Sequence, residues 1–201
     1  MSVSYVVKCI RKLFSPDAVT FLCVLKACSM MGLIEKGQKI HAKIVTHGII
    51  SHPLAGSSLI DMYVKFGFLE EAKYMFDKLP YHDVVSWTEL IAGYADHGHT
   101  KEALRCFEEM QFEGLMPDAI AMTCVLKACA CIGATFKGQE IYNNIANTSV
   151  CMNPFLQSTL IDLFGKGGSL AKAQHVFENL QEHDIVSWNA LISGYVEHGH
   201  G

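Results

Sequence analysis

Six glycines recur along this chain at almost even intervals, and their spacing says more about the fold than any other feature. The intervals are 35, 31, 35, 35 and 31 residues, so the series starts again after 101 residues. Self-similarity with a period of about 20 to 50 residues is typical of stacked units that cannot bury their apolar faces alone. We therefore expect a repeat array that functions through an extended surface. The glycines are Gly32, Gly67, Gly98, Gly133, Gly168 and Gly199.

The segments around these glycines predict two α-helices in each unit. In the unit 84–118, apolar residues recur at helical spacing on both sides of Gly98. Ser86 and Glu89 have the spacing of a capping box at the start of the first helix, and Gly98 is expected to end it in the left-handed conformation. No segment of useful length alternates apolar and polar residues. The predicted fold is therefore all-α.

Composition narrows the classes of function. No apolar run approaches the roughly 18 residues that cross a bilayer, so we expect no membrane partner. The net charge of −4 argues against a strongly basic nucleic-acid clamp, although net charge does not describe how the charges are distributed.

The eight cysteines favour packing over disulfide or metal chemistry. Cys23 and Cys28 recur one period later as Cys124 and Cys129, and the chain contains no CxxC. We expect free thiols that pack as small apolar side chains in a reducing compartment.

The first sixteen residues allow two interpretations. They contain Lys8, Arg11 and Lys12, several serines and no acidic residue, as an organelle transit peptide would. They also run into Pro16-Asp17, just as the stretch one period later runs into Pro117-Asp118. We favour the second half of a truncated repeat.

Several motifs, all in the same register, resemble the pentatricopeptide repeat. Val84-Val85-Ser86-Trp87-Thr88, followed by Glu102-Ala103-Leu104, is similar to its P type. Leu25-Lys26-Ala27-Cys28 is similar to the L type, and Ser58-Leu59-Ile60-Asp61 to the S type. The alternation of 35, 35 and 31 residues resembles the PLS subclass of plants. The resemblance implies a P-type second half at 1–17, L type at 18–52, S type at 53–83, P type at 84–118, L type at 119–153, S type at 154–184 and a P-type first half at 185–201.

The resemblance implies a right-handed α-solenoid that binds single-stranded RNA without a cofactor, one base per repeat, in a mitochondrion or chloroplast. In the family, the fifth residue of the first helix and the last residue of the repeat bond to the base edge. The pairs carried over are Ser57 with Asp83, Thr88 with Asp118, Thr123 with Asn153, Ser158 with Asp184, and Leu22 with His52, while Asn189 has no partner. Ser or Thr with Asp resembles the guanine-reading pair, Thr with Asn the adenine-reading pair, and Asn with Asp the uracil-reading pair.

Structural alternatives stay open for these residues. Ser, Thr, Asn and Asp offer donors or acceptors to a base, but at a helix start they are also ordinary N-caps. The residue three before each base-reading position is apolar, and in the family it sandwiches the base. Core burial would explain it equally well. These apolar residues are Val19, Leu54, Val85, Ile120, Phe155 and Val186.

Phosphate contacts are predicted for Lys65 and Lys166. Both occupy a late position in the first helix of an S unit, where family members often hold a basic residue near the RNA backbone. A solvated surface charge is the alternative. The P units hold an acid at this position and the L units hold Met30 and Cys131, so we expect weak RNA affinity from so short an array.

No motif predicts catalysis or a metal site. The His-Gly-His triplets at 97–99 and 198–200 lack further ligands at zinc spacing. The zinc-deaminase signature of the family's editing members, H-x-E with P-C-x-x-C, is absent, and so is a P-loop or nucleophile elbow. We expect this fragment not to be an enzyme.

The resemblance implies the RNA-targeting part of an organellar factor for C-to-U editing or RNA processing. The alternative is a protein-interaction scaffold that docks accessory editing proteins through its L repeats. A tetratricopeptide-like scaffold would keep a constant period of about 34 residues, which this chain does not.

Overall fold

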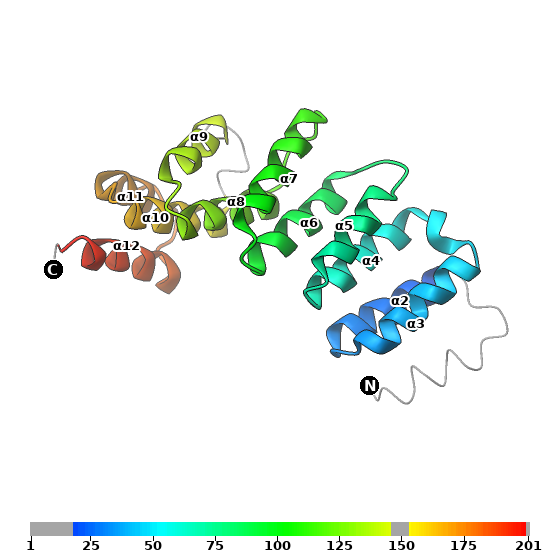
Figure 1. The fold of residues 1–201 in the computed structure, drawn as a ribbon. Helices are drawn as coiled ribbons and strands as arrows, with labels where there is room; N and C mark the ends of the chain where they lie inside the picture. The colour runs from blue at the N-terminus through cyan, green and yellow to red at the C-terminus, as the bar shows by residue number, and fades with distance from the viewer. Residues whose placement is uncertain (1–17, 146–152, 200–201) are drawn as a thin grey trace. The chain divides into compact units, whose positions relative to one another are not determined.

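The computed structural model describes residues 18–145 and 153–199, and all regular structure in these ranges is helical (Figure 1). The first helices of the predicted units begin at residues 18, 53, 84, 119, 154 and 185. They are α2 (Ala18–Met30), α4 (Pro53–Lys65), α6 (Val84–Asp96), α8 (Ala119–Cys131), α10 (Pro154–Lys166) and α12 (Ile185–Glu197). The second helices are α3 (Ile34–Thr46), α5 (Leu69–Asp77), α7 (Thr100–Phe112), α9 (Thr135–Ile145) and α11 (Leu170–Glu178), and a 3-10 helix spans Ile49–Ser51.

The difference between long and short units lies in the second helix. All first helices have 13 residues, whereas α5 and α11 of the predicted S units have 9 residues and α3 and α7 have 13. The S units are thus shorter by about one helical turn. The division into L, S and P types stays a prediction, and residues 1–17 lie outside the described residues.

The recurring glycines end the first helices, as predicted for Gly98. All six have a positive φ, between 68° and 80°. The amide that follows Gly98, that of His99, donates to the carbonyl of Tyr94 at 2.8 Å. This is the long-range bond of a Schellman stop, which glycine accommodates without a Cβ penalty.

The start of α6 corrects the predicted capping box. Oδ1 of Asp83 accepts from the Ser86 amide at 2.8 Å, and the Asp83 amide donates to Ser86 Oγ at 3.0 Å. The box is therefore Asp83 with Ser86, and the pairing of Ser86 with Glu89 was wrong. The helix begins at Val84, so Ser86 occupies the third helical position rather than the cap.

The described contacts divide the chain into two units, one ending at Gly93 and one beginning at Tyr94. In the first unit, α2 packs against α3 and α4, and α4 packs against α5. The buried residues of this unit include Phe21, Leu25, Ile44, Leu59 and Phe76. Stacking of successive pairs thus covers apolar faces that one pair would leave open.

In the second unit, α10 lies between α8 and α12 and contacts both. The contact with α12 is unusually close, since a Cβ added at Gly194 would lie 2.7 Å from Cα of Gly165. These two first helices therefore meet backbone to backbone. In residues 18–145 and 153–199, none of the helices is both long and apolar enough to span a membrane.

The described cysteines are free thiols, as predicted, but they differ in burial. Cys28, Cys106 and Cys129 are buried and pack as expected, whereas Cys23 and Cys131 are exposed. Burial raises the pKa of the Cys129 thiol to about 11, so it stays neutral and unreactive at neutral pH.

Candidate nucleic-acid interface

The residues predicted to end the units cap the helices that follow. Oδ1 of Asp184 accepts a hydrogen bond from the Ser187 amide at 2.7 Å, and hydrogen bonds from Ser187, above all from its backbone amide, lower the pKa of the Asp184 carboxyl. Capping, the structural alternative for these positions, is therefore real. It does not exclude a base contact, because a carboxylate has a second oxygen with its own lone pairs. The caps among the predicted base-reading residues are Asp83, Asp118, Asn153 and Asp184.

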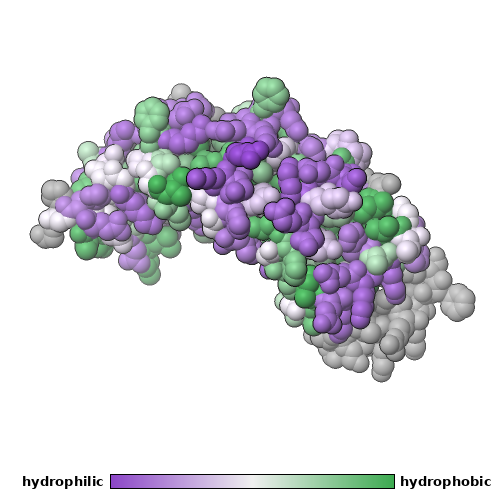
Figure 2. Space-filling model, in the orientation of Figure 1, coloured by the Kyte–Doolittle hydropathy of each residue, from purple (hydrophilic) through white to green (hydrophobic). Residues whose placement is uncertain are grey.

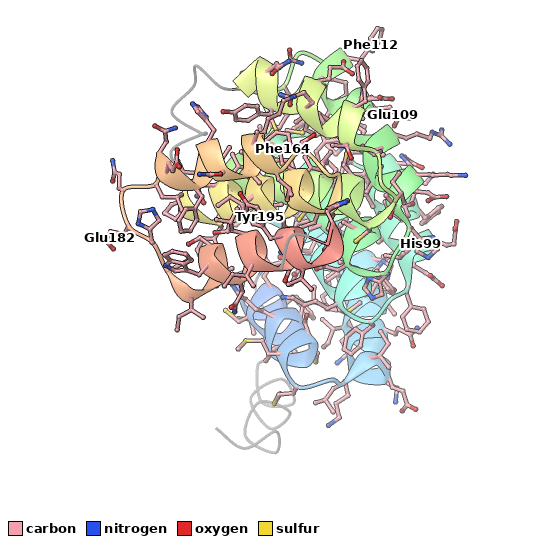
Figure 3. The ribbon with its side chains drawn as sticks, turned by 90° about the vertical axis from the view of Figure 1, so that its left-hand side faces the viewer. His99, Glu109, Phe112, Phe164, Glu182 and Tyr195 are labelled. Carbon is pink, nitrogen blue, oxygen red and sulfur yellow. The ribbon has the colours of Figure 1, made fainter. Side chains whose placement is uncertain are left out.

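Each predicted S unit has a small pocket that contains its predicted base-reading pair. Ser158 and Asp184 line a pocket of about 180 Å³ in the second unit. Ser57 and Asp83 line a pocket of about 60 Å³ in the first unit. Glu182, in the loop that leads into α12, borders the first of these pockets (Figure 3). The structure thus brings the two members of each pair into one pocket. The two pockets lie at equivalent repeat positions, 101 residues apart in sequence.

A shallow groove of about 370 Å³ crosses α8, α10 and α12 in the second unit. Its residues form three rows across these first helices. The middle row consists of the predicted base-reading residues Thr123, Ser158 and Asn189. The row before it contains Phe155 and Val186, and the row one helical turn beyond it contains Lys127, Asp162 and Ser193.

The apolar residues predicted to sandwich bases are on the surface. Their exposed fractions lie between 55% and 78%, which rules out the alternative of core burial. Exposed apolar side chains at one fixed position of the described repeats need another explanation than packing, since neighbouring positions such as Ala55 and Leu156 are fully buried. The exposed residues are Val19, Leu54, Val85, Ile120, Phe155 and Val186.

The predicted phosphate-contacting lysines form ion pairs within their own helices. Lys65 lies 2.7 Å from Asp61, and Lys166 lies 2.8 Å from Asp162. The hydrogen bond to Asp162 raises the pKa of Lys166, so this lysine keeps its charge. Both pairs are partly exposed, and the contact with phosphate stays a prediction.

Three predicted pairs are not brought together in one described pocket. Thr123 lines the groove across α8, α10 and α12, whereas its predicted partner Asn153 caps α10 and is not part of that groove. Thr88 is buried in the first unit, while Asp118 belongs to the second unit, where it caps α8. Leu22 offers no hydrogen-bonding group, and Nδ1 of its partner His52 accepts from the Leu54 amide at 3.2 Å. The pair Leu22 with His52 is therefore poorly equipped to read a base.

Sequence reasoning missed the third row of the groove. Lys127, Asp162 and Ser193 each follow a base-reading position by four residues. That spacing places two side chains on the same face of a helix, so the sequence contained the spacing within each helix but not the alignment of the three helices. In the part of the chain that the structure describes, no three His, Cys, Asp or Glu side chains gather as metal ligands, and His200 lies outside that part.

Stacked helix pairs with polar and apolar residues at equivalent repeat positions define an α-helical repeat protein. The PPR repeat model matches residues 19–49, 57–84, 158–185 and 186–201, and a PPR repeat family model matches residues 82–131. The chain belongs to the pentatricopeptide repeat family.

Relatives of known name agree with this assignment. The chloroplastic pentatricopeptide repeat-containing protein CRR2 of Arabidopsis thaliana is 38% identical over 191 residues, which cover 92% of this chain and 29% of the relative. A putative mitochondrial pentatricopeptide repeat-containing protein of the same plant is 37% identical over 186 residues, which cover 92% of this chain and 30% of the relative. The chain thus spans less than a third of the length of these relatives.

Solved structures show the same fold. The crystal structure of PPR10 from maize matches 94% of this chain and 28% of its own length with a TM-score of 0.66 at 22% identity. PPR10 in complex with an 18-nucleotide psaJ RNA element matches 96% of this chain and 27% of its own length with a TM-score of 0.71 at 18% identity. The likeness confirms the predicted fold class, an α-solenoid of helix pairs.

Proposed function

We propose that this chain is part of an array that binds single-stranded RNA in a sequence-specific way, with one base per repeat. The observation that carries the proposal is the presence of Ser57 with Asp83, and of Ser158 with Asp184, in equivalent pockets. A carboxylate beside a hydroxyl offers the acceptors that a guanine edge requires, and the hydroxyl of Ser158 can also donate once it exchanges the Pro154 carbonyl, to which it donates at 2.8 Å, for the base. The PPR10 complex supports the same use of this fold, since that protein is seen with an RNA element.

The exposed apolar row supplies the second part of the proposal. Unpaired bases of single-stranded RNA present their flat faces to protein side chains. Phe155 and Val186 line the groove that also contains Ser158 and Asn189. An apolar side chain beside each polar reading position would hold the base plane while the polar groups select its edge.

We extend the proposal to the natural context of the array. The relatives carry chloroplastic or mitochondrial in their names, which supports an organellar protein. In our proposal this chain targets an RNA for C-to-U editing or for processing, and it catalyses neither step itself.

Binding measurements with three nucleic acids test the proposal. We expect fluorescence anisotropy to show binding of a single-stranded RNA at about 50 mM salt, with weaker binding of the matching single-stranded DNA and of duplex RNA. Only unpaired RNA offers both free base edges and a 2′-hydroxyl. Equal affinity for the duplex would contradict base reading.

A scaffold that docks accessory editing proteins through its L repeats is the second candidate. It is favoured by exposed apolar residues in these units, of which Phe136 is 86% and Met30 is 77% exposed. On the face that Figure 2 draws, exposed apolar side chains are scattered among polar ones. Stable binding of a purified accessory protein, abolished by Phe136→Ser and without any RNA affinity, would favour the scaffold.

A further inference from the structure

We propose that Lys127 contacts the phosphodiester backbone of single-stranded RNA in the groove across α8, α10 and α12. The inference rests on the proposed RNA binding and assigns to an L unit a cationic contact that its sequence type does not predict. The equivalent residue of the first unit is also a lysine, Lys26, which occupies the same position of α2.

Geometry places Lys127 beside the predicted base-reading positions. It follows Thr123 by four residues on α8, and both residues line the groove together with Ser158 and Asn189 from the two neighbouring helices. The side chain is exposed. An ammonium on a four-carbon stem beside a row of base-reading groups can reach the backbone that joins the bases.

Charge pairing distinguishes Lys127 from two other lysines of the second unit, Lys137 and Lys166. Lys166 is held by Asp162 at 2.8 Å, and Lys137 is held by Glu108 at 3.0 Å. Within the described residues, Lys127 forms no ion pair. The acid that shares the groove, Asp162, is already paired with Lys166. A phosphate that approaches Lys127 therefore displaces no protein carboxylate from it.

The repeat pattern supports a cationic contact at this position. The late first-helix position that holds Lys65 and Lys166 in the S units holds Met30 and Cys131 in the L units. The L units carry Lys26 and Lys127 one helical turn earlier, where the S units carry acids. Each L unit thus has one lysine on its first helix, four residues earlier than the corresponding lysine of each S unit.

The salt dependence of RNA binding isolates this contact. Each phosphate contact with a single strand adds about −0.7 to the slope of log K against log salt concentration. We expect Lys127→Gln to make the slope of the full chain about 0.7 less negative with a labelled single-stranded RNA. The affinity loss should therefore be largest at low salt.

Two variants separate the local contact from net charge. Lys101→Gln removes the same charge from an exposed residue of the second helix α7 and should leave the slope unchanged. Lys127→Arg keeps the positive charge and should restore the slope of the original chain.

The outcomes distinguish the inference from the function on which it rests. Equal slopes for Lys127→Gln and the unchanged chain, or equal changes for Lys127→Gln and Lys101→Gln, would overturn the contact while RNA binding stands. Failure of the unchanged chain to bind any single-stranded RNA at low salt would overturn the proposed function itself. Circular dichroism of each variant establishes that the helices are intact.

Discussion

One carboxylate at the boundary between repeats caps a helix and, in our proposal, also reads a base. Asp83 begins α6 by accepting from the Ser86 amide, and it lines a pocket together with Ser57. Asn153 shows that an amide fits the same slot, because its Oδ1 accepts from the Phe155 amide at 3.0 Å. Capping and reading can therefore be separated by substitution.

Asp83→Asn should alter base preference without a large change in stability. Asn and Asp are comparable N-caps, so we expect the free energy of unfolding to change by less than about 0.5 kcal/mol. The pair Ser57 with Asn would resemble the adenine-reading pair, and preference at one position should move from G towards A by about 1–3 kcal/mol. Selection of bound RNAs from a random pool measures the shift.

The matched control for this variant is Asp83→Ala. It removes the cap, which costs about 1 kcal/mol, and urea unfolding should detect that loss. An unchanged base preference in Asp83→Asn would leave Asp83 as a helix cap alone.

The cap at α12 should respond to pH. Hydrogen bonds from Ser187 hold the folded pKa of Asp184 below the ordinary 3.8. The stabilisation by the carboxylate is therefore present above 3.8 and is lost as the pH falls through the lowered value. Urea unfolding at pH 7 and at several values below 4 should show a small stability advantage of the unchanged chain over Asp184→Asn, within the limit given for Asp83→Asn, that closes on acidification. A gap independent of pH would contradict this.

The sequence named these residues but could not choose between their roles. Asp before a helix is expected on capping grounds alone, and an apolar residue such as Phe155 near a helix start suits core or surface equally. The decision depends on where the neighbouring helix lies. The packing of neighbouring helices depends on the tertiary structure, which shows that Phe155 is exposed and that Ser158 and Asp184 line one pocket.

Between elements, a single position decides how closely two first helices approach. In the second unit, Gly165 and Gly194 allow backbone contact between α10 and α12. One period earlier, Val64 and Gly93 occupy these positions, and the Val64 methyl groups fill the space beside Gly93. Equivalent pairs of first helices are thus packed by the Val64 side chain in one unit and by direct backbone contact in the other.

Gly194→Ala should destabilise the second unit. Alanine favours a helix over glycine by about 1 kcal/mol, but its Cβ would meet backbone at 2.7 Å, and backbone cannot rotate away as a side chain can. We expect a net loss of about 1–3 kcal/mol from overpacking, measured by urea unfolding. Ser193→Ala, at the adjacent exposed residue, is the control and should be neutral. A more stable Gly194→Ala would show that the helices can separate at little cost.

Helix boundaries were easier to predict than the details of their ends. The glycines that end the first helices could be predicted because left-handed backbone strongly favours glycine. The capping box was misplaced by one turn because Asp83, Ser86 and Glu89 are spaced by three, and both neighbouring pairs satisfy the same pattern. Only the hydrogen bonds distinguish the two registers.

At the scale of the whole chain, the proposed correspondence of one base per repeat sets the length of RNA that we expect to be bound. The five complete predicted units, 18–184, should engage about five nucleotides. Affinity for single-stranded RNAs of increasing length should rise up to about five or six nucleotides and then level off, apart from a small statistical gain from overlapping registers. A length series measured by anisotropy tests this. Continued steep gains beyond ten nucleotides would contradict the one-to-one correspondence.

The periodicity of the chain was sufficient to predict an all-α array, because glycine spacing and helical apolar patterns agree over nearly every unit. The groove was not predictable in full. Thr123 and Ser158 were expected from their repeat positions, but the third row with Lys127 and Asp162 becomes visible only where α8, α10 and α12 lie side by side. Spacing within one helix does not tell how the rows of neighbouring helices align.

The double task of the capping position restricts how such an array can acquire a new target. A substitution at Asp83 or Asp184 must still begin a helix, and the side chains that do so well are Asp, Asn, Ser and Thr. These four differ in the donors and acceptors they present. If the capping residue also reads a base, as we propose, base preference can therefore change among these four residues while the helix start is kept. Lys, Arg or Leu at the same position would remove the N-cap hydrogen bond and destabilise the start of the helix, whatever base it could contact. The need to start a helix thus limits which residue types can replace these two aspartates when base preference changes.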